Sequence, residues 1–248
     1  MKGGERVNSA LRELYLNRMS GMLEMINNDR NLSDPLLMSV DDKYLQAHTK
    51  IMVVGQETNG WEYDPKRDSG DDPGWPIQLS CNDYVDLLMQ RYQNTHWKKF
   101  FNASAYWRAA DFLYEQLNDY AERPDIGYLW NNLDKVDYNR KKLPDTVRQM
   151  VHDRFLVLKE EVEITKPDVL VLFVGERYDQ LLEKSGCKIV SLEKETGISQ
   201  DILVRLQWPN VFPAESYILP HPRQLQSLGN WDSLAKVTSL IKSRNEKK

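Results

Sequence analysis

The pattern of apolar and polar residues along the chain predicts a series of helices and strands. Apolar residues recur at helical spacing over 5–28, 81–93, 103–120, 145–165, 177–184 and 232–243. Short apolar runs, often rich in β-branched residues, predict strands at 50–54, 126–133, 168–174, 188–192, 202–206 and 217–219. Strands and helices therefore alternate, which is typical of α/β proteins.

The segment 168–174 is apolar almost throughout, with the sequence DVLVLFV. A strand of this composition is normally buried on both faces, as in a parallel sheet that is covered by helices. We therefore expect a three-layer α/β/α fold with a mostly parallel central sheet. Residues 1–248 are expected to form a single domain, in which residues 1–45 are an N-terminal helical extension.

Composition narrows the class of protein. With 248 residues, of which 41% are hydrophobic and 28% charged, the chain is expected to be soluble and globular. No apolar run of about 18 residues predicts a membrane span, and the N-terminus lacks the apolar core of a secretory signal. The two cysteines, Cys81 and Cys187, are too few for a thiolate-ligated cluster. We expect a cytoplasmic monomer that uses no metal, cofactor or membrane.

The charge balance bears on possible partners. A net charge of −4 is mild evidence against a dedicated nucleic-acid binder, because such proteins usually present a basic surface. A local basic groove is still compatible with it, since salt limits the reach of a charge to about 8–10 Å. The sequence has no motif of the nucleotide hydrolases, zinc proteases or α/β-hydrolases.

Polar residues that are able to carry chemistry lie at the ends of three predicted strands. Gln56 and Glu57 follow the first strand, Asn131 and Asn132 end a middle strand, and His221 follows the last strand. Ligands of open α/β sheets bind outside the carboxyl ends of the strands. If the sheet is parallel, a carboxylate, a carboxamide and an imidazole are expected to meet in one pocket.

The order and spacing of these motifs resemble the uracil-DNA glycosylase superfamily. The matching motifs are Gly55-Gln56-Glu57, Asn132-Leu133-Asp134-Lys135 and His221-Pro222-Arg223-Gln224-Leu225. The run 167–175 is similar to the family's buried strand that closes in glycine. The resemblance covers about residues 51–240, and it implies the fold of that family and hydrolysis of an N-glycosidic bond in DNA.

The resemblance also implies catalytic and base-binding roles. Glu57 would stabilise positive charge on the sugar and orient a water molecule. His221, held between two prolines, would stabilise the negative charge on the departing base. Asn132 would read the edge of a pyrimidine, because a carboxamide offers both a donor and an acceptor. Gln56 is assigned to the base pocket beside it.

Further residues are assigned to the flipped base and to the DNA. Trp61 or Trp75 would stack on the base. Leu225 matches the position of an apolar wedge that fills the gap in the base stack, and Lys135 and Arg223 are expected to contact phosphates. The expected partner is DNA that contains uracil or a damaged base.

The motifs also depart from the family pattern. Thr58 and Asn59 stand where one branch of the family has proline and tyrosine, and that tyrosine excludes the methyl group of thymine. Arg223 and Gln224 replace small or proline residues. Two alternatives therefore stay open. One is a catalytically inactive member of the same fold that binds nucleic acid or another ligand, and the other is an enzyme that acts on nucleosides or nucleotides.

Overall fold

The computed structural model describes residues 3–58, 60–61, 77–95, 104–118, 127–208 and 215–245. The chain divides into two compact units, each assembled from three segments. Unit 1 comprises Met1–Val40, Gln56–Thr95 and Asn131–Thr165, and unit 2 comprises Asp41–Gly55, His96–Trp130 and Lys166–Lys248. Within the described ranges, no helix is both long enough and apolar enough to cross a membrane.

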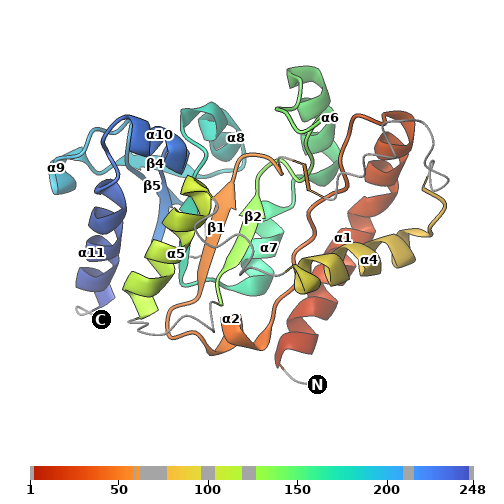
Figure 1. The fold of residues 1–248 in the computed structure, drawn as a ribbon, viewed down its shortest axis with the longest axis horizontal. Coiled ribbons are helices and arrows are strands. Elements are labelled where there is room, and N and C mark those ends of the chain that lie inside the picture. The colour runs from red at the N-terminus through yellow and green to blue at the C-terminus, as the bar shows by residue number, and fades with distance from the viewer. Residues whose placement is uncertain are drawn as a thin grey trace. The chain divides into compact units, whose positions relative to one another are not determined.

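Unit 1 is built around helix α1 (Gly3–Asn28). This helix packs against α4 (Cys81–Asn94), α6 (Asp145–Phe155) and α7 (Leu158–Thr165) (Figure 1). The buried face of α1 repeats every three or four residues, as an amphipathic helix requires, and it includes Leu11, Tyr15, Met19, Met22 and Ile26. Within unit 1, α1 is therefore a core element.

The helix expected over 145–165 is two helices, so the prediction of one continuous helix is wrong. α6 ends at Phe155, residues Leu156 and Val157 are not helical, and α7 begins at Leu158. Phe155 and Val157 are both buried, although positions two apart in a continuous helix point in nearly opposite directions. The break allows both side chains to enter the core. Neither proline nor glycine marks it in the sequence.

The described strands form a six-stranded sheet in the order β2–β1–β3–β6–β5–β4. Their bounds are β1 Ile51–Gly55, β2 Leu129–Asn132, β3 Val169–Leu172, β4 Lys188–Ser191, β5 Val204–Gln207 and β6 Glu215–Ile218. β1 pairs with β3 and β3 with β6 in parallel, whereas β5 is antiparallel to β4 and β6. These strands belong to unit 2 except for the last two residues of β2. The α/β class and the mostly parallel sheet are confirmed.

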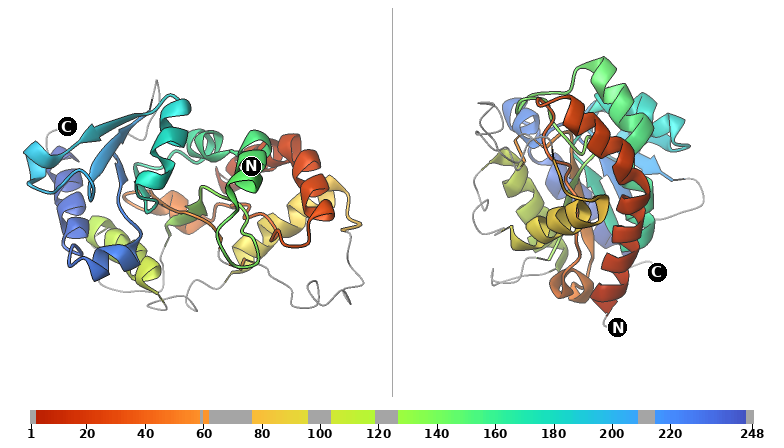
Figure 2. Two further views of the ribbon diagram at one scale, coloured as in Figure 1. Left: turned by 90° about the horizontal axis from the view of Figure 1, so that it is seen from above. Right: turned by 90° about the vertical axis from the view of Figure 1, so that its right-hand side faces the viewer.

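Helices of unit 2 lie on both faces of this sheet (Figures 1 and 2). α5 (Ala105–Asn118) packs against α10 (Pro222–Ser227) and α11 (Ser233–Asn245) on one face. The 3₁₀ turn η3 (Glu176–Tyr178) leads into α8 (Asp179–Lys184) on the other face. Two short helices, α2 (Asp42–Gln46) and α9 (Glu193–Thr196), complete the unit.

The carboxyl ends of β1, β3 and β6 lie side by side in unit 2. The backbone N–H of Phe173 donates to Val54 O at 2.7 Å, and that of Gly175 donates to Leu219 O at 3.1 Å. β2 and β3, which follow β1 along the chain, lie on opposite sides of β1. Because ligands of open α/β sheets bind outside the carboxyl ends of the strands, the ends of β1, β3 and β6 in unit 2 are where a ligand is expected.

Candidate functional site

His221 follows β6 and caps the N-terminus of α10. Its Nδ1 accepts a hydrogen bond from the backbone N–H of Arg223 at 3.2 Å. A neutral imidazole that accepts at Nδ1 carries its proton on Nε2. The described residues offer Nε2 no hydrogen-bond partner. The Nε2–H is therefore available to a ligand.

The imidazole of His221 favours its neutral form. Burial lowers the pKa of His221, and the positive charge of Arg223 lowers it further. A neutral imidazole with a fixed tautomer can donate a hydrogen bond to an oxygen that gains negative charge during a reaction.

Aromatic rings support the imidazole from α5. Tyr106 stacks on His221, with ring centroids 6.2 Å apart and planes 24° apart. Phe173 and Trp107 meet the Tyr106 ring edge-on, at 5.8 Å and 5.2 Å, and Trp107 in turn packs against Trp130 at 5.3 Å. Burial raises the pKa of Tyr106, so its hydroxyl stays protonated. The stack limits the rotation of the imidazole.

Tyr106 was not among the predicted site residues, because its helical spacing is that of a core residue in the helix expected at 103–120. Three bulky residues in a row, Tyr106, Trp107 and Arg108, were the available signal at the start of that helix. Arg108 Nη2 donates to Gln226 Oε1 at 2.9 Å and so links α5 to α10. The helix that supplies the stacking ring is thereby tied to the helix that His221 caps.

In unit 1, the segment after β1 is fixed at its beginning and near its end. Gln56 O accepts the backbone N–H of Asp134 at 2.8 Å. Asp137 accepts the Thr58 hydroxyl at 2.7 Å and the backbone N–H of Gly60 at 2.5 Å. Glu57 lies between these attachments and is partly exposed, which suits a carboxylate that contacts a ligand. The neighbouring Asn59 lies outside the described residues.

Asn131 and Asn132 end β2 in unit 1, and their side chains have different surroundings. The fully buried Asn131 carboxamide bonds to Glu161 and to Lys135. Asn132 is only 4% exposed, yet its carboxamide has no hydrogen-bond partner in the described part of the chain. Because a carboxamide that the described residues do not engage can bond to a ligand, Asn132 is a candidate for ligand recognition, and Asn131 is structural.

Two residues that were expected to contact DNA are buried, and both expectations are corrected. Lys135 is 0% exposed in unit 1 and forms an ion pair with Glu161 at 2.6 Å. Leu225 is 0% exposed in unit 2, because it points inward from α10, a helix that sequence analysis did not anticipate. Neither side chain can reach a phosphate or enter a base stack. Arg223 is exposed on α10 and stays available for a phosphate.

The two tryptophans that were expected to stack on a base have different outcomes. Trp61 is 9% exposed within unit 1, and Trp75 lies outside the described residues. The stacking role of Trp61 or Trp75 stays a prediction.

A buried cluster in unit 1 holds the turn after β2. Asp134 Oδ1 lies 2.5 Å from His152 Nε2, and Asp134 Oδ2 accepts from Arg148 Nε at 3.1 Å. The Asp134 side chain is 0% exposed and that of His152 is 8% exposed. Since the backbone of Asp134 also bonds to Gln56, this cluster helps to fix the segment that carries Glu57. His152 therefore has a structural role.

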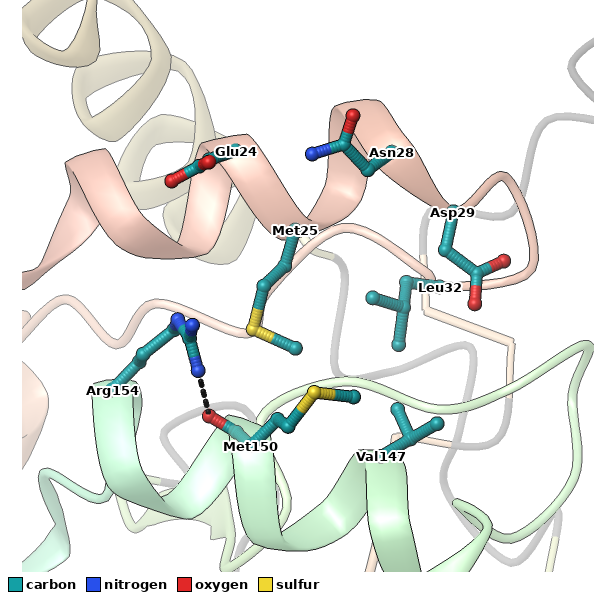
Figure 3. A pocket seen from close by; sticks show the side chains of 8 residues that line it. All are labelled: Glu24, Met25, Asn28, Asp29, Leu32, Val147, Met150 and Arg154. Atoms are coloured by element: carbon teal, nitrogen blue, oxygen red, sulfur yellow. Dashed lines mark hydrogen bonds between the residues drawn. The ribbon is translucent and has the colours of Figure 1, made fainter.

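A separate groove of about 240 Å³ lies between α1 and α6 in unit 1 (Figure 3). Its apolar lining residues are Met25, Leu32, Val147 and Met150, and its polar ones are Glu24, Asn28, Asp29 and Arg154. Arg154 Nη1 donates to the backbone oxygen of Met150 at 3.3 Å (Figure 3). None of the predicted site residues lines this groove, so it is distinct from the candidate site.

The described residues contain no metal site, and the comparisons with known proteins found no match that would indicate a function. Over the described ranges, no group of three or more His, Cys, Asp or Glu side chains is arranged to hold a metal ion. No protein-family model matches the chain, and no curated protein matches it. The function is therefore inferred from the residues themselves.

Proposed function

We propose that the protein is a DNA glycosylase that flips uracil, or a related damaged base, out of DNA and hydrolyses its N-glycosidic bond. The observation that carries this proposal is the state of His221 at the end of β6. Its Nδ1 is occupied by the backbone of Arg223, and its Nε2–H has no partner among the described residues. A departing uracil takes the bonding electron pair and accumulates negative charge on its oxygen, which this donor stabilises.

Asn132 supports recognition of the base. A nearly buried carboxamide that has no partner among the described residues can donate to one polar atom of a pyrimidine edge and accept from its neighbour. Recognition of this kind discriminates strongly, because a ligand without the matching groups leaves the amide unpaired.

Glu57 is assigned to the sugar. As the glycosidic bond breaks, positive charge develops on the sugar, and a carboxylate stabilises it and orients the attacking water. The water adds its hydroxyl to the anomeric carbon, and its proton is released to the carboxylate or to solvent. The attachments of the 56–60 segment to Asp134 and Asp137 keep this carboxylate on a fixed backbone.

The fold and the exposed side chain of Arg223 are consistent with the proposal. The mostly parallel α/β sheet and the order of the three motifs agree with the glycosylase superfamily fold, which we propose for this chain. Arg223 is exposed beside His221 and suits contact with a phosphate near the base.

The test is a single-turnover assay with uracil in single- and double-stranded oligonucleotides. We expect excision by the wild type, and a loss of about 10²–10³-fold in rate for His221→Ala and for Asn132→Ala. His48→Ala, a change at an exposed histidine, should keep the wild-type rate. The uracil assignment fails if the wild type releases no base at micromolar enzyme. Near-wild-type rates in both site variants would refute the roles of these residues.

An enzyme that acts on free nucleosides or nucleotides is the second candidate. The burial of Lys135 and Leu225 favours it, because it removes two of the three predicted contacts with DNA. This function predicts base release from free deoxyuridine or its monophosphate and weak, non-competing binding of oligonucleotides. Excision from DNA without release from nucleosides would exclude it. Salt-dependent binding of DNA without any excision would instead indicate an inactive member of the fold.

A further inference from the structure

A fully buried polar network lies beneath the end of β2 in unit 1. Lys135 Nζ donates to both carboxylate oxygens of Glu161, at 2.6 and 2.7 Å. The hydroxyl of Tyr15 donates to Glu161 Oε1 at 2.7 Å and accepts from the backbone N–H of Met38 at 3.1 Å. Lys135, Glu161 and Tyr15 are all 0% exposed.

This network reaches the candidate base reader through Asn131. Asn131 Nδ2 donates to Glu161 Oε2 at 2.8 Å, and Asn131 Oδ1 accepts from Lys135 Nζ. The same oxygen accepts the backbone N–H of Asn132 at 2.8 Å. The carboxylate can only accept and the ammonium can only donate, so together they leave the Asn131 carboxamide a single orientation.

We propose that Lys135 and Glu161 are positioning residues that fix Asn132 for recognition of the base. The proposal rests on the function proposed above. Neighbouring side chains of a strand point to opposite faces, so while Asn131 is held by the ion pair, Asn132 presents its carboxamide away from it. The bond from the Asn132 backbone to Asn131 Oδ1 transmits the fixed geometry from one residue to the next.

The composition of the network indicates more than stabilisation of the fold. Burial lowers the pKa of Lys135, and only the contacts with Glu161 oppose this effect. A buried ion pair can often be replaced by uncharged residues of similar size without loss of stability. Such a replacement would, however, remove the Lys135 ammonium, which can only donate, and the Glu161 carboxylate, which can only accept. These two groups set the orientation of the Asn131 carboxamide.

A paired substitution, Lys135→Met with Glu161→Gln, tests the proposal because it removes both charges and nearly keeps the volume. We expect the paired variant to stay folded, with a thermal midpoint close to that of the wild type. The backbone amide of Asn132 should exchange with solvent about 10-fold faster or more, because its acceptor is no longer fixed. Excision should slow by about 10²-fold, and Asn132→Ala should slow the paired variant much less than it slows the wild type.

The Asp34–Arg91 ion pair of unit 1, whose side chains are 10% and 33% exposed, provides the control. Its atoms lie 2.8 Å apart, and its partner Tyr84 is not part of the Asn131 network. Arg91→Met with Asp34→Asn should leave both the exchange of the Asn132 amide and the excision rate unchanged. The proposal is overturned if the Lys135/Glu161 variant keeps wild-type exchange and rate, or if the control pair produces the same changes.

If the paired variant does not fold, Glu161→Gln alone replaces it. A carboxamide offers one acceptor oxygen where the carboxylate offers two, so position 161 no longer accepts from Asn131 and Lys135 on separate oxygens, and the hold on Asn131 weakens while the side-chain volume is kept. Wild-type exchange at Asn132 in this variant would overturn the proposal. If the wild type excises no base, the proposed function is refuted. The positioning of Asn132 by Lys135 and Glu161 is still tested, because hydrogen exchange at Asn132 does not depend on activity.

Discussion

The ring of Tyr106 on α5 stacks on the imidazole of His221, with centroids 6.2 Å apart and an angle of 24° between the planes. Stacking fixes the plane of the imidazole, and the bond from the Arg223 backbone to Nδ1 fixes its tautomer. Together these two contacts define the direction in which Nε2–H can donate. Two helices of unit 2 thus set the geometry of one candidate catalytic group.

The first prediction concerns the ring of Tyr106. Tyr106→Phe should keep the excision rate within about 3-fold of the wild type, because the hydroxyl makes only a long contact of 3.5 Å with Val53 O. Tyr106→Ala removes the stack and leaves a cavity, so it should lower the unfolding free energy by about 2–4 kcal/mol and slow excision by about 10-fold or more. Urea unfolding and single-turnover kinetics measure the two effects. Equal rates in the two variants would show that the stack does not orient His221.

The second prediction is a pH dependence that arises at His221. The folded-state pKa of His221 is lowered below the ordinary value of 6.5, first by burial and then by Arg223. The unfolded chain therefore binds the proton more readily, and the stability from the neutral imidazole is present above pH 6.5 and lost as the pH falls toward the lowered pKa. Protonation also places a hydrogen on Nδ1 and breaks the bond from Arg223. Histidine NMR titration should show a midpoint below 6.5, and Arg223→Gln should raise it.

A third prediction separates the two asparagines at the end of β2. Asn132→Ala removes a carboxamide without partners among the described residues, so the unfolding free energy should change by less than about 1 kcal/mol while excision falls by about 10²–10³-fold. Asn131→Ala removes one buried hydrogen-bond partner from Lys135 and one from Glu161, and it should cost about 2–4 kcal/mol of stability. Chemical unfolding of both variants measures the two changes in unfolding free energy, and single-turnover kinetics measures the rate of excision. A large loss of stability in Asn132→Ala would show that its role is structural.

Secondary structure that is determined by residues close in sequence could be predicted from the sequence. β3 was predictable because an apolar run followed by glycine leaves few alternatives, and α4 was predictable because Ser80 caps it, accepting from the backbone of Asp83 at 3.2 Å. Both features depend on residues that are close in sequence. The parallel pairing of β1, β3 and β6 followed from the alternation of strands with helices.

The environment of single polar residues was harder to predict, because it depends on distant partners. Lys135 is buried because Glu161, 26 positions away, accepts its charge. Leu225 is buried because Pro222 begins a helix, α10, that turns this side chain inward. The motif pattern identified the positions of both residues, but it carried no information on the residues that surround them. Their assignment to DNA contact failed for that reason.

A fourth prediction concerns Asp179, the first residue of α8 in unit 2. Burial and the charges of Glu176 and Glu183 raise the pKa of Asp179 to about 6. Because the folded pKa exceeds the ordinary value of 3.8, the associated stability is full below pH 3.8 and is lost as the pH rises through about 6. Asp179→Asn should therefore raise the thermal midpoint at pH 7.5 and have little effect at pH 4. A variant that is less stable than the wild type at pH 7.5 would contradict this assignment.

The last prediction concerns Gly60, which ends the segment that carries Glu57. Gly60 has a φ of +89°, and an added Cβ would lie 3.0 Å from Arg140 Cγ. Gly60→Ala should therefore lower the unfolding free energy by about 1–2 kcal/mol and, because the backbone near Glu57 must shift, slow excision by about 10-fold. Gly21→Ala, within α1 of the same unit and only 3.5 Å from the flexible Arg154 side chain, should stabilise by about 0.5–1 kcal/mol instead. Urea unfolding and single-turnover assays of the two variants measure both effects, and the same sign of change in both would show that backbone conformation does not control this segment.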